Sequence, residues 1–109
     1  MPLLYSFETE TTADILKIVA QNLQKRRLEK GLSRNSLSKI SGVPAASIAK
    51  FEQKHTISLA SYAALANALG YTKAVKELLS QPLFSTMAEL DMINKNKKRK
   101  RGDRNEACK

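Results

Sequence analysis

The sequence has no tryptophan, one cysteine (Cys108) and one histidine (His55) in 109 residues. A lone cysteine cannot form an internal disulfide, which fits a reducing cytoplasm. There is also no pair of cysteines or histidines at metal-ligand spacing, no glycine-rich phosphate loop and no close pair of carboxylates. We therefore expect no enzymatic activity, no metal and no cofactor. His55 has no second ligand or nucleophile beside it, and a contact with phosphate or solvent is its expected role.

Long hydrophobic runs are absent as well. No segment approaches the roughly 20 apolar residues that span a membrane. Residues 1–5 have neither a basic start nor an apolar stretch adequate for a secretion signal. A chain of this length buries one modest core. We therefore expect a single-domain cytoplasmic protein with no membrane partner.

Basic residues are abundant, and they concentrate at one end of the chain. The formal net charge is +9, and residues 95–109 contain eight Lys and Arg against two Asp and Glu. A charge run of this kind is typical of a solvated, disordered end, and it can also add sequence-independent attraction to phosphate groups. We predict a disordered basic tail over residues 95–109, preceded by a short amphipathic extension over residues 81–94.

The stretch from Leu32 to Glu52 indicates two short helices joined by a tight turn. Ser33 is a good N-cap for the first helix, and Gly42 can end it in a left-handed backbone conformation. Pro44 fits the start of the second helix, where a missing N–H is no loss. Apolar residues fall three apart in each helix, Leu37 with Ile40 and Ile48 with Phe51. Two helices with such a turn form a helix-turn-helix unit.

Three further helices are predicted from apolar spacing and capping residues. The first spans residues 13–30, with Thr12 as its cap and an apolar stripe of Ile15, Ile18, Val19, Leu23 and Leu28. The fourth spans residues 59–69 after the cap Ser58, with core positions at Leu59, Tyr62, Leu65, Ala66 and Leu69. The fifth spans residues 73–79 after the cap Thr72. The prediction is therefore an all-α fold, a compact five-helix domain over residues 13–80 that follows an N-terminal arm at residues 1–12.

The residues Leu32-Ser33-Arg34, Leu37, Ser41-Gly42-Val43, Ser47-Ile48 and Phe51-Glu52 resemble the DNA-binding core of the Xre family, the Cro and lambda-repressor type. The resemblance implies a lambda-repressor-like fold and double-stranded DNA as the partner. It also implies that the second helix of the unit lies in the major groove. A homodimer on a palindromic operator is the expected binding form, because two copies double the contacts.

The resemblance also implies which side chains face the DNA: Arg34, Asn35, Ala45, Ala46, Ser47, Lys50 and Lys54. Arg34 starts the preceding helix and would meet phosphate. Many relatives carry long amides where this chain has Ala45 and Ala46, and alanines offer only methyl contacts to thymine. Lys50, Ser47 and the deformability of the DNA would then supply more of the specificity.

The same family pattern implies a structural ion pair between Arg27 and Glu52. In the family, an arginine near the end of the first helix pairs with the glutamate that closes the recognition helix. A buried pair of this kind is costly to break from one side.

The order of segments is similar to that of HipB-type antitoxins, with an apolar arm, a helix-turn-helix core, residues 82–90 and a basic tail. This second resemblance implies an autorepressing antitoxin that binds a HipA-type kinase toxin or another operon-encoded protein, nucleoid-associated when it is on DNA. Alternatives are a phage repressor, a restriction controller and a stand-alone regulator. A protein-interaction module that keeps the helix-turn-helix as a scaffold also stays open. The alanines of the second helix favour that module, whereas the grouping of Arg34, Lys50 and Lys54 opposes it.

Overall fold

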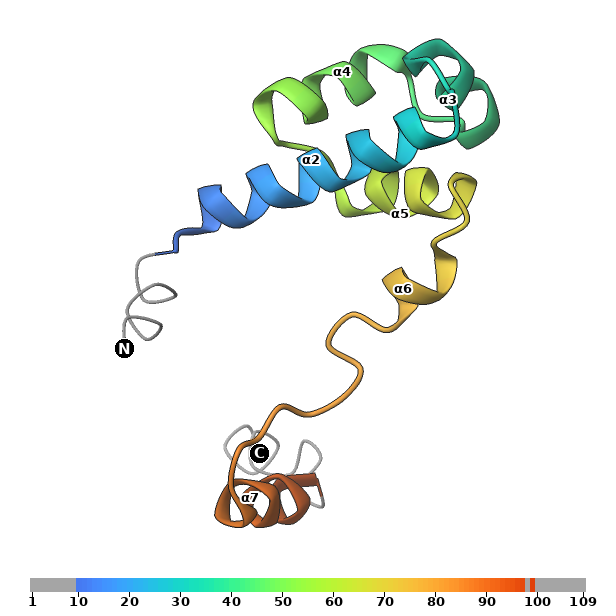
Figure 1. Ribbon diagram of the computed structural model, residues 1–109. Coiled ribbons are helices and arrows are strands. Elements are labelled where there is room, and N and C mark those ends of the chain that lie inside the picture. Colours follow the sequence, from blue (N-terminus) through green and yellow to red (C-terminus); the bar gives the residue numbers. More distant parts are fainter. Residues whose placement is uncertain (1–9, 98, 100–109) are drawn as a thin grey trace, which may run out of the picture. The chain divides into compact units, whose positions relative to one another are not determined.

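The computed structural model describes residues 10–97 and residue 99. Within these residues the secondary structure is six helices and no strand, so the predicted all-α fold is confirmed. The helices are α2 (Thr12–Glu29), α3 (Arg34–Ser41), α4 (Ala45–Lys54), α5 (Leu59–Ala68), α6 (Thr72–Lys76) and α7 (Met87–Lys97) (Figure 1). The chain divides into two compact units, of which the first ends at Lys76 and the second begins at Glu77. Most of the predicted arm and of the predicted tail lies outside the described residues.

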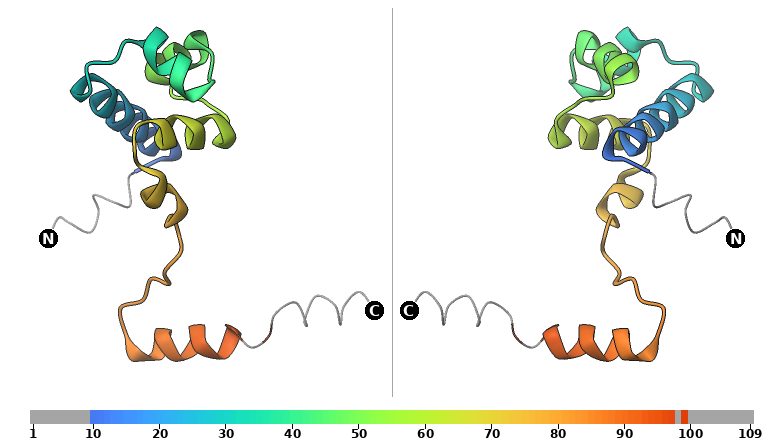
Figure 2. Two further views of the ribbon diagram at one scale, coloured as in Figure 1. Left: turned by 90° about the vertical axis from the view of Figure 1, so that its right-hand side faces the viewer. Right: turned by 90° about the vertical axis from the view of Figure 1, so that its left-hand side faces the viewer.

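The first unit is built around contacts between α3 and its neighbours. α3 packs against α4 and α5, α2 packs against α4, and α6 packs against α5 (Figure 2). The buried apolar side chains come from α2, α3, α4, α5 and the turns between them: Ala20, Leu23, Leu37, Val43, Ile48, Phe51, Leu65, Ala66 and Leu69. The rings of Phe51 and Tyr62 meet edge-on with their centroids 5.7 Å apart, a favourable aromatic geometry. These contacts fix the orientation of α4 in the unit.

Several residues predicted to be apolar contacts of the core are exposed instead. They are Ile15, Ile18, Leu28, Ile40 and Leu59. In α2 the buried face is the one that carries Ala20, Leu23 and Arg27. Because each residue turns a helix by about 100°, Ile18 and Leu28 point to other sides. Leu59 is the first residue of α5, one turn before Tyr62 begins the packed part of that helix.

The start of α2 differs by one residue from the prediction. Thr11, and not Thr12, is the N-cap, and its hydroxyl oxygen accepts from the backbone N–H of Asp14 at 3.1 Å. The Asp14 carboxylate in turn accepts from the N–H of Thr11 at 3.1 Å. This reciprocal capping box requires a spacing of three residues, which only Thr11 provides.

The turn between α3 and α4 has the predicted helix-turn-helix form. Ser33 caps α3 by accepting from the N–H of Ser36 at 3.0 Å, and Gly42 ends it with φ at 81°. Val43 is buried in the turn, and Pro44 is the N-cap of α4. The stretch predicted to hold both helices ends at Glu52, whereas α4 continues through Lys54. His55 then ends it with a left-handed backbone at φ 66°.

The segment after α5 is less regular than predicted. α6 has five residues and ends at Lys76 rather than at residue 79, and both Leu78 and Leu79 are exposed. In the second unit, Thr86 caps α7 by accepting from the N–H of Glu89 at 3.1 Å. The Glu89 carboxylate accepts from the N–H of Ser85 at 2.6 Å. α7 runs through Lys97, so it includes the first residues of the segment predicted as a tail.

Gly42 and His55 allow a paired test of the helix ends. A left-handed residue with a Cβ costs about 1–2 kcal/mol, whereas glycine adopts this conformation freely. Gly42→Ala should lower the free energy of unfolding by about 1 kcal/mol. The cost is in the backbone alone, because none of the described atoms beyond the neighbouring residues lies within 4 Å of the added Cβ. His55→Gly should raise the free energy of unfolding by up to about 1 kcal/mol. Urea unfolding measures both, and a Gly42→Ala variant as stable as the wild type would contradict the expectation.

Candidate nucleic-acid interface

The carboxylate of Glu52 lies inside the first unit, near the C-terminal end of α4. Its side chain is 1% exposed. Arg27 of α2 donates from Nε to Oε2 at 2.7 Å and from Nη2 to Oε1 at 2.9 Å. The same guanidinium donates from Nη1 to the carbonyl oxygen of Leu32 at 2.8 Å. The ion pair implied by the family pattern is therefore present in the structure, as a bidentate pair that joins α2 to α4.

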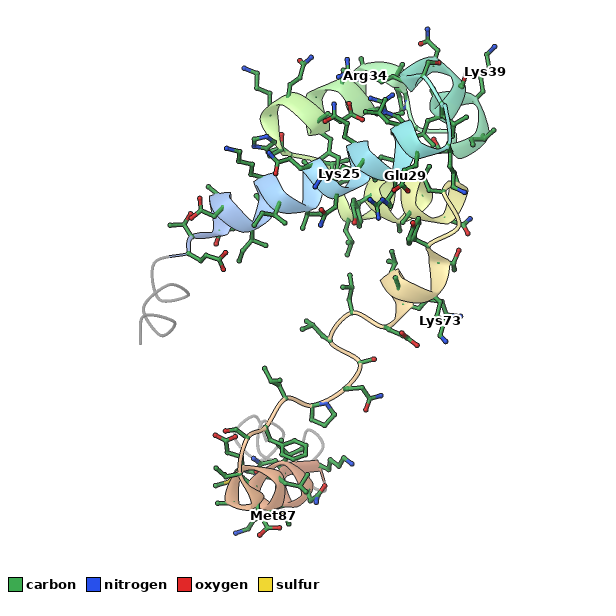
Figure 3. The ribbon with its side chains drawn as sticks, in the orientation of Figure 1. Lys25, Glu29, Arg34, Lys39, Lys73 and Met87 are labelled. Atoms are coloured by element: carbon green, nitrogen blue, oxygen red, sulfur yellow. The ribbon has the colours of Figure 1, made fainter. Side chains whose placement is uncertain are left out.

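Glu52 also binds a second arginine. This is Arg34, at the start of α3, which is labelled in Figure 3. Arg34 donates from Nε to Oε1 at 3.0 Å, and its Nη2 lies 2.9 Å from the same oxygen. Gln24 of α2 donates to this oxygen at 3.3 Å. The predicted partner of Arg34 was a phosphate, and its contact with Glu52 was not predicted. No local spacing could have indicated it, because the two residues are 18 positions apart.

The two arginines determine the charge state of Glu52. Burial raises the pKa of the Glu52 carboxyl, but the hydrogen bonds and positive charges of Arg27 and Arg34 outweigh burial and hold the pKa below its ordinary value of 4.5. The carboxyl is therefore ionised at neutral pH, and the three groups together carry one surplus positive charge. Because the Arg27 side chain is 7% exposed and that of Arg34 is 34% exposed, this charge reaches solvent through Arg34.

Six of the seven residues predicted to face DNA, all but Lys54, lie around two shallow depressions. The first lies between the starts of α3 and α4 and is lined by Arg27, Ser33, Arg34, Asn35, Ala45, Ala46 and Ala49. The second lies between α4 and the start of α5 and is lined by Ser47, Lys50, Thr56, Ile57, Ser58 and Ser61. The side chain of Lys54 is exposed in the last turn of α4. The structure thus brings Arg34, Asn35, Ala45 and Ala46 together, and it places Ser47 and Lys50 together at a second position on α4.

The second depression also contains residues that were not predicted to face DNA. Thr56 and Ser61 contribute hydroxyl groups beside Lys50, and Ser58 is the N-cap of α5. The signal that could have found them is the presence of three hydroxyl residues within residues 56–61, around a predicted helix start. His55, the only histidine, has a backbone role as the C-cap of α4.

Among residues 10–97 and 99, no group of three or more His, Cys, Asp or Glu is arranged to hold a metal ion. None of the described helices combines the length and the apolar character that crossing a membrane requires.

Residues 23–75 match the family model described as helix-turn-helix. They form an Xre-type helix-turn-helix domain. The Xre domain includes Glu52 and its three side-chain partners Gln24, Arg27 and Arg34, and it includes both depressions. Its match begins within α2 and ends within α6. A domain of this family implies a DNA-binding transcriptional regulator. Neither the curated proteins nor the solved structures contain a significant match to the chain.

Glu52→Gln should strongly destabilise the Xre domain. It leaves Arg27 buried without its counter-charge, and breaking a buried ion pair from one side costs about 3–5 kcal/mol. Glu29→Gln is the matched control, because Glu29 pairs with Arg26 at 3.0 Å on the surface and exposed pairs contribute about 1 kcal/mol or less. Thermal and urea unfolding of both variants measure the difference, and a Glu52→Gln midpoint equal to that of the wild type would contradict a stabilising pair.

Melting temperatures measured at low pH test the same prediction in a second way. The pKa of Glu52 is lower in the folded chain than in the unfolded chain, so its stabilisation is complete above the unfolded-state pKa and is lost as the pH falls through the folded-state pKa. The gap in melting temperature between the wild type and Glu52→Gln should therefore narrow below about pH 4.5. A gap that is constant down to pH 3 would show that the Glu52 charge does not contribute.

Proposed function

We propose that the protein is a sequence-specific repressor that binds a palindromic operator in double-stranded DNA as a homodimer. The observation that carries the proposal is the surface of α4 and the start of α3, where small side chains lie beside exposed basic ones. Phe51 and Ile48 face the core, so the opposite side of α4 is available to a partner. A helix with this exposure fits the major groove, which is about 12 Å wide. Two copies then occupy half-sites about 10 bp or a multiple apart.

Each group on this surface has a proposed role. Ala45 and Ala46 allow close approach and offer methyl contacts to thymine. Ser47 and Lys50 contact base edges from the middle of α4, and Arg34 and Asn35 contact the DNA from the start of α3. Lys54 meets a phosphate at the end of the helix. Since the alanines carry no hydrogen-bonding group, sequence-dependent DNA shape contributes to the choice of site.

The basic C-terminal segment adds attraction that does not choose sequence. Residues 95–109 carry eight of the 19 Lys and Arg of the chain. Each phosphate that such a residue neutralises contributes about 0.9 to the slope of log affinity against log salt concentration. Phosphate contacts fix the position of a protein on the duplex but do not specify bases, so the segment strengthens binding to operator and random DNA alike.

Lys50→Ala should weaken binding to the operator by about 1–3 kcal/mol if Lys50 reads a base, and should relax specificity at that base pair. Lys39→Ala is the control with the same loss of charge, because Lys39 lies in the last turn of α3, away from Arg34 (Figure 3). Gel-shift titrations with the protein's own promoter at stated salt measure both. Equal affinities for promoter and random duplex in the wild type would reject the repressor and favour the protein-interaction module.

A second candidate function is that of a HipB-type antitoxin whose partner is a HipA-type kinase toxin or another product of the same operon. The observation that favours it is the second unit, which exposes large apolar side chains outside the Xre domain. They include Leu83, Phe84, Met87 and Met92. Leu83 and Met92 lie around one depression with Ala88, Glu89 and Ile93. An exposed apolar surface of this kind suits a protein partner.

Met92→Glu should abolish binding to the operon-encoded partner, because it places a charge in an apolar contact. Operator affinity should stay within about twofold of the wild type, since Met92 lies outside the Xre domain. Pull-down of the co-expressed neighbouring gene product and gel shifts measure the two effects. If the Met92→Glu variant still captured the operon-encoded partner, the surface around Met92 would be rejected as the contact with that partner.

A further inference from the structure

The guanidinium of Arg34 has one edge occupied and one edge open. Nε and Nη2 are held at 3.0 and 2.9 Å from Oε1 of Glu52. Nη1 has no hydrogen-bond partner within residues 10–97 and 99, and a third of the side chain is exposed. An arginine has five N–H donors in a rigid planar fork. Holding the Nε edge therefore fixes the direction of the other edge, where Nη1 and Nη2 present two parallel N–H groups.

Arg34 is one of the residues that line the depression between the starts of α3 and α4. On the α4 side this depression is lined by Ala45, Ala46 and Ala49, and none of these carries an atom beyond Cβ. No long α4 side chain competes for the space, so a DNA group can approach the guanidinium directly. The absence of polar groups on the α4 side leaves Arg34 as the exposed charged donor among the residues that line the depression.

We propose that Glu52 is a positioning residue for DNA recognition, which holds Arg34 so that its open edge donates two hydrogen bonds to a pair of acceptors on the DNA. The pair is O6 and N7 of a guanine or two oxygens of one phosphate, since both match the arginine fork. The inference rests on the proposed DNA-binding function. It gives Glu52 a role beyond its ion pair with Arg27.

The direction in which Glu52→Gln changes operator affinity distinguishes a positioning role of Glu52 from a simple effect of net charge. Removing a negative charge makes the protein more positive, which alone strengthens binding to a polyanion. A positioning role gives the opposite result, because Arg34 loses the negative charge that holds it and must be immobilised on binding. The expected loss of operator affinity is about 2- to 12-fold, the entropic cost of ordering one long side chain.

The first experiment measures operator affinity for the wild type, Glu52→Gln, Arg34→Ala and the double variant, at a temperature where circular dichroism shows each to be folded. Arg34→Ala should weaken binding about 5- to 150-fold. The double variant should bind no more weakly than Arg34→Ala, since Glu52 acts through Arg34. Glu52→Gln affinity equal to or above that of the wild type would overturn the proposal, and so would losses that multiply in the double variant.

A second variant keeps the proposal testable if Glu52→Gln does not fold. Arg34→Lys retains the charge but has no planar fork, so it should lose nearly as much affinity as Arg34→Ala. Arg26→Lys is the matched control, because Arg26 pairs with Glu29 on the surface of α2, and its affinity should not change. An Arg34→Lys variant with wild-type affinity would overturn the proposal.

Operators with single base-pair replacements and a salt series identify the acceptor. A guanine contact predicts that Arg34→Ala loses discrimination at one base pair with an unchanged salt slope. A phosphate contact predicts uniform weakening and a slope lower by about 0.9. Either pattern supports the proposal. The absence of both patterns would overturn it. If the wild type itself does not prefer operator to random duplex, the proposed function fails, whereas a specific wild type with unaffected Arg34 variants refutes only this inference.

Discussion

Burying the Glu52 carboxylate removes it from water, which costs several kcal/mol unless hydrogen bonds replace its hydration. The chain replaces that hydration with donors from two other helices, Arg27 and Gln24 of α2 and Arg34 at the start of α3. Arg27 also donates to the carbonyl of Leu32, in the loop between those helices. One ionised group therefore sets the positions of α2, α3 and α4 relative to one another, and apolar contacts fill the space between them.

The apolar core and the turn residues together determine the position of α4. Ile48 and Phe51 are fully buried on one side of α4, which determines the rotation of the helix about its axis. Gly42 adopts its left-handed backbone conformation without strain where the chain turns between α3 and α4, and Val43 is buried in this turn. With rotation and start both fixed, the outward positions of α4 follow. A surface that contacts bases needs such fixed positions, because base contacts require side chains held at defined positions.

Local features of the structure could be predicted from the sequence, and long-range side-chain contacts could not. Ser33, Gly42 and Ser58 are caps in the structure because capping depends on residues three or four positions apart. The exposure of Ile18 and Leu59 could not be foreseen, because an apolar spacing does not show which part of a stripe has a partner. The Arg27–Glu52 pair came from family resemblance alone. The contact between Arg34 and Glu52 depends on the packed arrangement of α3 and α4, for which the sequence carried no pattern.

The alanines at the start of α4 change how the proposed recognition surface works. Ala45 and Ala46 carry no hydrogen-bonding group, so polar contacts must come from the flanks, Arg34 on one side and Lys50 on the other. A flanking arginine on a flexible stem would lose rotamer freedom on binding, but Arg34 is already held by a buried carboxylate. The contact with Glu52 in the core therefore restricts the motion of the Arg34 side chain at the surface. Under this proposal, fold stability and DNA recognition depend on the same carboxylate, so a substitution at Glu52 is expected to change both.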